Sequence, residues 1–379
     1  MAENPTQEHR QVVRPKPLEV GMSVSQFIDR ACLGSTAGEL AAIAQALTGE
    51  VLNDPDVLVG VSLDARLMAG GTGIAALAPL MAGGYIDWAV ITGTNLYYDA
   101  LYALGKTFHF APAGPRQGES DCGGGVVISQ AEREAAETEL REILSAADFQ
   151  QAMGSAELHD RLGVHLRTRE KNLGVEYPSL LTAAQDAGVP IYNPSPADNP
   201  LGSLVAHLSL VGNRLALEPS VDLNEGAALL HGATLEGRRC ALWCLGRGTA
   251  ADFLFGVPDH LATMLGPEHR IHYAARIRMA DQAHGIPGAA MATPFPIGAE
   301  PPLAGQEAIV PEETTDRSLS TDLTIALPLL AAYILDRLPP RPLKRLARRR
   351  DDLLDRLRLT YQQSALRQAY RQSALRRKP

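Results

Sequence analysis

Residues 87–99 read Asp87-Trp88-Ala89-Val90-Ile91-Thr92-Gly93-Thr94-Asn95-Leu96-Tyr97-Tyr98-Asp99, and this stretch decides the fold class. It begins as an apolar run typical of a buried strand, breaks at a small-residue turn over residues 92–95, and continues with apolar residues at helical spacing. Such a turn leaves free backbone N–H groups at the start of the helix. They form either an anion-binding site or an ordinary strand-to-helix connection, and the stretch alone leaves both interpretations open.

The rest of the chain repeats this alternation of short apolar runs and helical patterns. Further strand-like runs lie at residues 57–63, 189–193, 239–245 and 272–279. Small-residue turns follow several of these runs, as expected where parallel strands end beside a ligand. We therefore predict an α/β fold with a Rossmann-like, doubly wound, mostly parallel sheet and a ligand at its carboxyl edge. The Pro- and Gly-rich segment 109–125 is predicted to be a long loop, serving as a lid or an oligomer contact.

The composition indicates a globular protein without a membrane span. Of 379 residues, 45% are apolar, which allows a sizeable core. No apolar run has the length of a transmembrane helix, and residues 1–5 show no signal-peptide pattern. The four cysteines have no His or Cys partner at zinc-ligand spacing, so we predict no metal site and a cytoplasmic protein with reduced thiols.

Charge and composition divide the chain into three parts. Residues 1–20 are polar and proline-rich and are predicted to form a flexible arm, residues 21–340 one large domain, and residues 341–379 a basic helical tail. The tail holds thirteen Lys and Arg against three Asp and Glu, whereas the remainder holds 22 basic and 40 acidic residues. An acidic body suits cationic partners such as polyamines. The tail is either a solvated extension or a contact for an anionic partner or another subunit.

Several motifs, in order and spacing, resemble the deoxyhypusine synthase family from about Pro17 to Leu338. The resemblance is greatest to the bacterial branch described as deoxyhypusine-synthase-like or homospermidine-synthase-like. The motifs are residues 90–96 with Asp99, residues 189–192 with Asp198 and Leu201-Gly202, residues 245–248, and residues 322–330. No single motif carries the resemblance, but the ordered set does.

The resemblance implies a homotetramer that binds NAD near a subunit interface within a Rossmann-like domain. It also implies transfer of a hydride from a polyamine to NAD, capture of the aminobutyl group by a family lysine, and delivery to an acceptor amine. By the same resemblance, Thr92, Gly93 and Thr94 would contact the NAD phosphates and Asp198 a ribose hydroxyl. Gly246 and Gly248 would allow close approach of the dinucleotide, and Asp322 would reach the adenine. Each residue also has a structural alternative: the glycines as turns, and Asp198 as the cap of the helix beginning near Leu201.

The sequence departs from the family where the chemistry is expected. The family lysine falls on or near Ala299, and no lysine occurs between Lys171 and Lys344. Arginine cannot replace it, because a guanidinium stays protonated and is not a nucleophile. The acidic pair expected after the Thr-Gly turn is Tyr97-Tyr98, and an acid expected near residues 279–285 is His284. These three residues are weak candidates for acid–base groups.

Three functions remain open from the sequence. The first is a divergent NAD-dependent transferase or oxidoreductase that acts on an amine or polyamine without a lysine imine. The second is a catalytically inactive paralogue that regulates or assembles with a true family enzyme. The third is a non-enzymatic module that holds an anionic partner through the tail. Genuine deoxyhypusine or homospermidine synthase activity is a further alternative.

Overall fold

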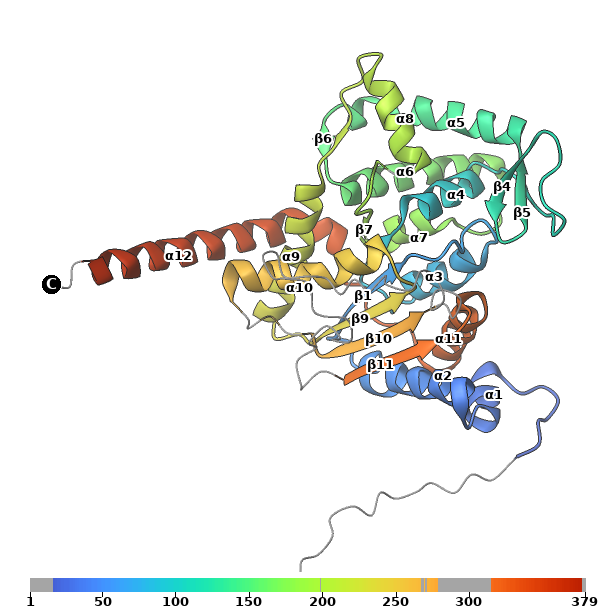
Figure 1. The fold of residues 1–379 in the computed structure, drawn as a ribbon, viewed down its shortest axis with the longest axis horizontal. Coiled ribbons are helices and arrows are strands. Elements are labelled where there is room, and N and C mark those ends of the chain that lie inside the picture. The colour runs from blue at the N-terminus through green and yellow to red at the C-terminus, as the bar shows by residue number, and fades with distance from the viewer. Residues whose placement is uncertain (1–15, 198, 267–268, 270, 279–314, 377–379) are drawn as a thin grey trace, which may run out of the picture.

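The computed structural model describes residues 16–197, 199–266, 269, 271–278 and 315–376, with the backbone alone for residues 365–376. A parallel sheet of six strands lies at its centre (Figure 1). The strands are β1 (Leu58–Leu63), β2 (Trp88–Ile91), β7 (Ile191–Tyr192), β9 (Cys240–Leu245), β10 (Tyr273–Arg278) and β11 (Thr315–Ser320). Their spatial order is β7-β2-β1-β9-β10-β11. Numbered along the chain, this is 3-2-1-4-5-6. The predicted α/β class with a mostly parallel sheet is confirmed.

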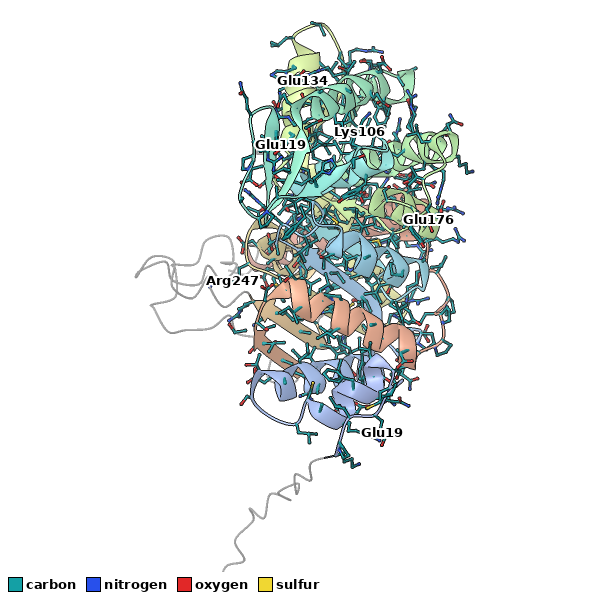
Figure 2. The ribbon with its side chains drawn as sticks, turned by 90° about the vertical axis from the view of Figure 1, so that its right-hand side faces the viewer. Glu19, Lys106, Glu119, Glu134, Glu176 and Arg247 are labelled. Carbon is teal, nitrogen blue, oxygen red and sulfur yellow. The ribbon has the colours of Figure 1, made fainter. Side chains whose placement is uncertain are left out.

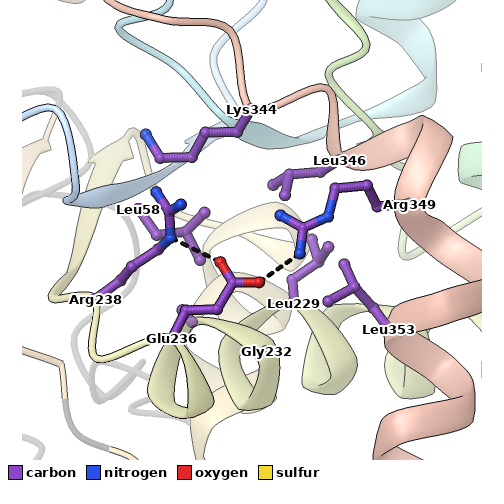
Figure 3. A pocket seen from close by; sticks show the side chains of 10 residues that line it. Leu58, Leu229, Gly232, Glu236, Arg238, Lys344, Leu346, Arg349 and Leu353 are labelled. Atoms are coloured by element: carbon purple, nitrogen blue, oxygen red, sulfur yellow. Dashed lines mark hydrogen bonds and ion pairs between the residues drawn. The ribbon is translucent and has the colours of Figure 1, made fainter.

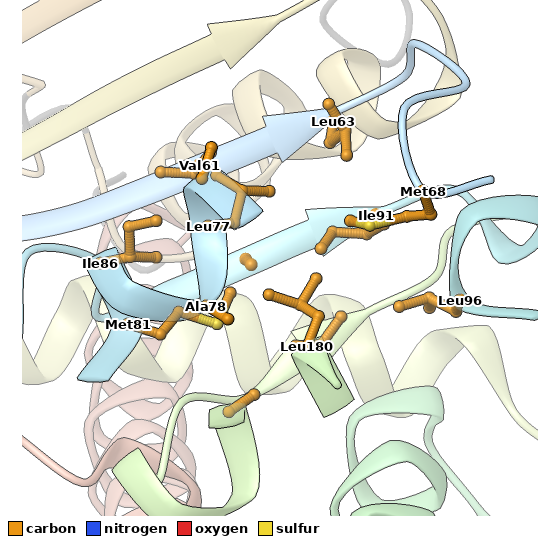
Figure 4. Packing of buried hydrophobic residues seen from close by; sticks show 14 of the residues in the cluster. Val61, Leu63, Met68, Leu77, Ala78, Met81, Ile86, Ile91, Leu96 and Leu180 are labelled. Carbon is orange, nitrogen blue, oxygen red and sulfur yellow. The ribbon is translucent and has the colours of Figure 1, made fainter. Parts of the chain in front are cut away.

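Both faces of the sheet are buried, because successive strand side chains enter two different hydrophobic clusters. Val59, Val61 and Leu63 of β1 belong to the larger cluster, and Leu58 belongs to the smaller one. The larger cluster packs α2 (Ser35–Ala46), α3 (Thr72–Ala82), α4 (Gly93–Ala103), α7 (Leu180–Ala187) and α11 (Leu323–Arg337) against the sheet. Figure 4 shows Leu77 of α3, Leu96 of α4 and Leu180 of α7 in this cluster. The smaller cluster packs α9 (Pro219–Leu235), α10 (Thr249–Leu265) and the start of α12 (Arg350–Arg376).

The segment predicted as a long loop contains most of a small antiparallel sheet. Its strands are β3 (Phe108–Phe110), β4 (Glu119–Gly123) and β5 (Val126–Ser129), in the order β3-β5-β4. Helix α5 (Gln130–Leu144) follows directly, and Lys106 pairs with Glu139 of this helix at 2.7 Å. Figure 2 shows Glu119 and Glu134 in this part of the molecule. The prediction of a long loop over residues 109–125 was therefore wrong for the strand residues, which pair with one another rather than with the main sheet.

The remaining elements complete the layers around the sheet. They are α1 (Val24–Ala31), the π-helical turn η1 (Leu47–Val51), η2 (Ala147–Phe149), β6 (Ala152–Met153), α6 (Ser155–Leu173), α8 (Pro200–Ser209), β8 (Ala216–Leu217) and η4 (Leu346–Arg349). Among the helices described, none combines the length and the apolar character needed to cross a bilayer.

Candidate functional site

Three neighbouring strands end side by side at the carboxyl edge of the sheet. Leu63 of β1 lies level with Ile91 of β2 and with Leu245 of β9. The next residues, Thr92 and Asp64, continue the pairing: Thr92 N donates to Leu63 O at 3.3 Å, and Asp64 N donates to Leu245 O at 3.0 Å. The turns that begin α3, α4 and α10 therefore meet at this edge.

The first turn of α4 presents backbone amides without acceptors. Thr92 is the N-cap residue, in an extended conformation and without a side-chain cap bond. Its carbonyl accepts from Asn95 N at 3.0 Å and from Leu96 N at 3.3 Å. Within the described part of the chain, the amides of Gly93 and Thr94 form no hydrogen bond. This turn has the donors that an anion needs at a helix N-terminus.

Asn95 holds this turn in place, and it was not singled out in the sequence. Its side chain is 1% exposed. Its Oδ1 accepts from Leu67 N at 3.2 Å and Met68 N at 3.3 Å, and its Nδ2 donates to Ala65 O and Thr92 Oγ1, both at 2.9 Å. All four hydrogen-bonding positions of the amide are used. Asn95 thereby ties the turn after β2 to the loop after β1.

Gly93 packs against the loop that follows β7. A Cβ atom on Gly93 would lie 2.2 Å from Asn199 Cγ and 2.6 Å from Asn193 Nδ2. Asn199 is the cap of α8, because its Oδ1 accepts from Gly202 N at 3.1 Å. The alternative in which Asp198 caps this helix is therefore wrong. Asp198 itself lies outside the described residues.

Asp64 occupies the N-terminus of α10, a contact that the sequence did not reveal. Its Oδ1 accepts from Ala250 N at 2.9 Å and its Oδ2 from Ala251 N at 3.0 Å. Burial raises the pKa of this carboxyl to about 6. A Cβ atom on Gly246 would lie 3.1 Å from Asp64 Cβ, and one on Gly248 would lie 2.7 Å from Asp64 Oδ1. The two predicted cofactor glycines therefore accommodate a side chain of the protein itself.

The tyrosines after the turn are engaged in packing. Tyr97 is 2% exposed, and its hydroxyl donates to Glu137 Oε1 of α5 at 3.2 Å. Tyr98 packs against Tyr97 and Phe108, and burial raises its pKa to about 12. A phenol of this kind is a poor proton acceptor at neutral pH.

The last motif residue of the turn helix, Asp99, is also structural. Its two carboxylate oxygens accept from Leu180 N at 2.7 Å and Leu181 N at 2.8 Å, at the start of α7. Asp99 is fully buried. It therefore fixes α7 against α4 rather than facing the open turn at residues 92–94.

The remaining predicted residues do not gather at this turn. Asp322 follows β11 at the opposite edge of the sheet, where its Oδ1 accepts from Thr324 N at 2.8 Å and from Thr324 Oγ1 at 2.7 Å. Four strand spacings separate β11 from β2, roughly 19 Å. His284 and Ala299 lie outside the described residues.

Comparisons with known proteins all find proteins described as deoxyhypusine synthases or as similar to them. The family profile "Deoxyhypusine synthase" matches residues 28–334. A "Deoxyhypusine synthase-like protein" of Nostoc sp. strain PCC 7120 is 37% identical over 357 residues, which covers 92% of this chain and 91% of the relative. One from Thermosynechococcus vestitus is 35% identical over 376 residues, covering 96% and 91%. A solved structure of a candidate deoxyhypusine synthase from Entamoeba histolytica shares the fold, with a TM-score of 0.52 and 12% identity over 87% of this chain and 99% of that one.

Proposed function

The chain belongs to the deoxyhypusine synthase family, and from this membership we propose that it is an NAD-dependent enzyme that acts on an amine or polyamine without a lysine imine. The family resemblance drawn from the motifs is confirmed by the profile and the relatives. We propose three further points: that the substrate is an amine or polyamine, that the cofactor is NAD, and that no imine with a lysine is formed.

The observation that carries the proposal is the first turn of α4, whose leading amides have no hydrogen-bond acceptor among the described residues. Its free amides at Gly93 and Thr94 lie at the carboxyl end of β2, beside the end of β1. The strand order 3-2-1-4-5-6, with both faces covered, is that of doubly wound Rossmann domains, in which dinucleotides bind at this edge. The donor set fits a pyrophosphate, so Thr92, Gly93 and Thr94 would hold it. Asp198 would contact a ribose, whereas Asp322, four strand spacings away, has no part in this proposed site.

The substrate class follows from the family and from charge. NAD, when bound, would accept a hydride from the carbon bonded to the amine nitrogen. This hydride transfer needs no lysine. Excluding the tail, the chain carries 22 basic and 40 acidic residues, which favours cationic ligands over anionic ones. Because no lysine occurs between Lys171 and Lys344, an imine produced from the amine would react directly with a second amine or with water.

Calorimetric titration of the purified full-length protein with NAD tests the proposal. We expect binding, and NADH absorbance should appear when di- or polyamines are added. The variant Thr94→Asp places a carboxylate at the second position of α4, where it favours the helix but repels a phosphate. We expect at least tenfold weaker NAD binding with an unchanged melting temperature.

A matched control is Ser220→Asp, at the second position of α9, which should leave NAD affinity unchanged. Absence of NAD binding to the unmodified protein would overturn the proposal. Equal NAD affinity of the Thr94→Asp variant and the unmodified protein would exclude the α4 turn as the phosphate site.

One observation favours a second candidate, a catalytically inactive paralogue. The nucleophile is missing, and Tyr97 and Tyr98 replace the expected acids with side chains engaged in packing. Such a protein would assemble with an active family enzyme. Co-purification from its own cells, followed by mass spectrometry, should then recover a family member that contains the lysine. Recovery of this chain alone, together with NADH formation from amines, would exclude the candidate.

A further inference from the structure

Helices α4 and α10, which begin on either side of the end of β1, differ in the hydrogen bonds of their first amides. The first amides of α4, at Gly93 and Thr94, form no hydrogen bond within the described residues. The first amides of α10, at Ala250 and Ala251, both donate to the carboxylate of Asp64. The first amides of α4 therefore lack an acceptor, whereas those of α10 already hold a carboxylate of the chain itself.

Asp64 lies directly beside the open turn. Leu63 and Ile91 are paired across β1 and β2, so the residues that follow them, Asp64 and Thr92, leave adjacent strands at the same edge of the sheet. The bonds of Asn95 to both loops fix this arrangement. A phosphate held at Gly93 and Thr94 would therefore lie within Coulombic reach of the Asp64 carboxylate, in a half-buried setting where screening is weak.

The surroundings of Asp64 leave its negative charge unbalanced by a cation. Asp252, on α10, is a second carboxylate that raises the pKa of Asp64, and Arg247 acts on Asp252. Cys244 lies nearby on β9, and Arg66, two residues after Asp64, is exposed. In the described part of the chain, only the α10 amides oppose the Asp64 charge.

We propose that Asp64 limits nucleotide affinity, as a built-in competitor for the phosphates at this edge. The inference rests on the proposed function, because it assumes that the α4 turn receives a dinucleotide. The carboxylate fills the α10 N-terminus and repels a phosphate at α4. A phosphate at α4 therefore either binds despite repulsion by the Asp64 carboxylate or displaces that carboxylate from the amides of Ala250 and Ala251.

The test compares NAD affinity, by calorimetry at pH 7.5, between the unmodified protein, Asp64→Asn and Asp252→Asn. The Asp64→Asn variant should bind NAD at least tenfold more tightly. Asp252→Asn removes the same charge from an exposed residue of the same helix and should change the affinity less than threefold. Equal affinities of the unmodified protein and the Asp64→Asn variant would overturn the inference.

Thermal unfolding shows whether the Asp64→Asn variant is folded. A second measurement uses only the unmodified protein. Asparagine offers one acceptor oxygen where the Asp64 carboxylate offers two, so Asp64→Asn should lose one hydrogen bond to α10, and cooperative unfolding of the variant shows that it is folded. Independently, the affinity of the unmodified protein for NAD should rise as the pH falls through about 6, where Asp64 takes up a proton. Affinity that is flat between pH 5 and 7.5 would count against the inference whatever the variant does.

Failure of the proposed function gives a different result. If neither protein binds NAD, the proposed function is wrong, and the same two proteins are then titrated with inorganic pyrophosphate. The inference predicts that Asp64→Asn binds pyrophosphate at least tenfold more tightly than the unmodified protein. Equal or absent pyrophosphate binding would overturn the inference as well.

Discussion

Gly93 lacks a side chain because two asparagines occupy the space beside it. A Cβ atom would lie 2.2 Å from both Cγ and Nδ2 of Asn199. Asn199 cannot move freely, because its Nδ2 donates to Ser195 O at 3.0 Å and Pro196 O at 3.1 Å while its Oδ1 caps α8. At this residue, the close packing of Asn199 and Asn193 requires glycine.

The variant Gly93→Ala should therefore lose stability as well as any ligand. We expect a loss of about 1–3 kcal/mol in the free energy of unfolding, typical of an overpacked buried site. Urea unfolding followed by circular dichroism measures it. Gly256→Ala in α10 is the control: its Cβ would meet nothing within 4 Å, so the variant should gain about 0.5–1 kcal/mol. A fully stable Gly93→Ala would contradict the packing described at the α4 turn.

The segment between α11 and α12 is bound to the body. Arg341 is 7% exposed, and its Nη2 donates to the carbonyl oxygens of Asp54, Pro55 and Val57. Lys344 Nζ lies 3.1 Å from both carboxylate oxygens of Asp87, a buried residue immediately before β2. In Figure 3, Lys344 and Arg349 lie above Glu236 at the end of α9.

The proximal part of α12 packs tightly on α9, whereas its distal part leaves the body. Leu353 and Leu357 are buried, and a Cβ atom on Gly232 of α9 would lie 2.4 Å from Leu353 Cδ2. His231 Nε2 lies 3.0 Å from Thr360 Oγ1. Beyond this contact the helix projects away from the sheet and its covering helices (Figure 1).

Two truncations should consequently behave differently. Removal of residues 362–379 keeps the contacts of Lys344, Leu353 and Thr360, so the melting temperature should stay within about 2 °C. Removal of residues 341–379 leaves Asp87 buried without Lys344. It also exposes the surface of α9 that Leu353 and Leu357 cover. Loss of one partner of a buried ion pair alone costs about 3–5 kcal/mol. Equal melting temperatures of the two truncated proteins would contradict this account of the tail.

The central strands were predictable because their residues are apolar and buried on both faces. All six residues of β1 and of β9 are buried. The strand β11 was missed because only Leu319 in it is buried. It is an edge strand, paired with β10 alone, so its conformation comes from that partner rather than from its own pattern.

The candidate site was predictable in part for a similar reason. The turn at residues 92–95 depends on local sequence, and small residues after a strand indicate it directly. The contact of Asp64 with α10 joins residues 186 positions apart, so no local pattern reveals it. The glycines at 246 and 248 were recognised from the sequence, but the side chain of Asp64 that packs against them was not.

Across the whole molecule, several carboxyl groups are buried without full compensation. Burial raises the pKa of Asp64 and Asp222 to about 6, of Asp99 to about 7 and of Glu225 to about 8. In each case the folded pKa exceeds the unfolded value of 3.8 or 4.5. Their stabilising contribution is thus complete below those values and is lost as the pH rises through 6 to 8. His159 acts oppositely, because burial lowers its pKa to about 4 and its contribution is lost as the pH falls from 6.5.

The protein should therefore be more stable at pH 6.0 than at pH 8.5, by about 4–5 kcal/mol, since one pKa unit corresponds to about 1.4 kcal/mol and the groups with pKa values of about 7 and 8 lose most of their protons in this range. Urea unfolding at the two pH values measures this difference. The variant Glu225→Gln, which removes the group with the highest of these pKa values, should reduce the difference most. Glu134→Gln, at an exposed position of α5, should leave it unchanged. Higher stability at pH 8.5 would contradict this account. It would mean that these carboxyl groups are solvated in the folded protein, although Asp99 is bonded to two amides of α7.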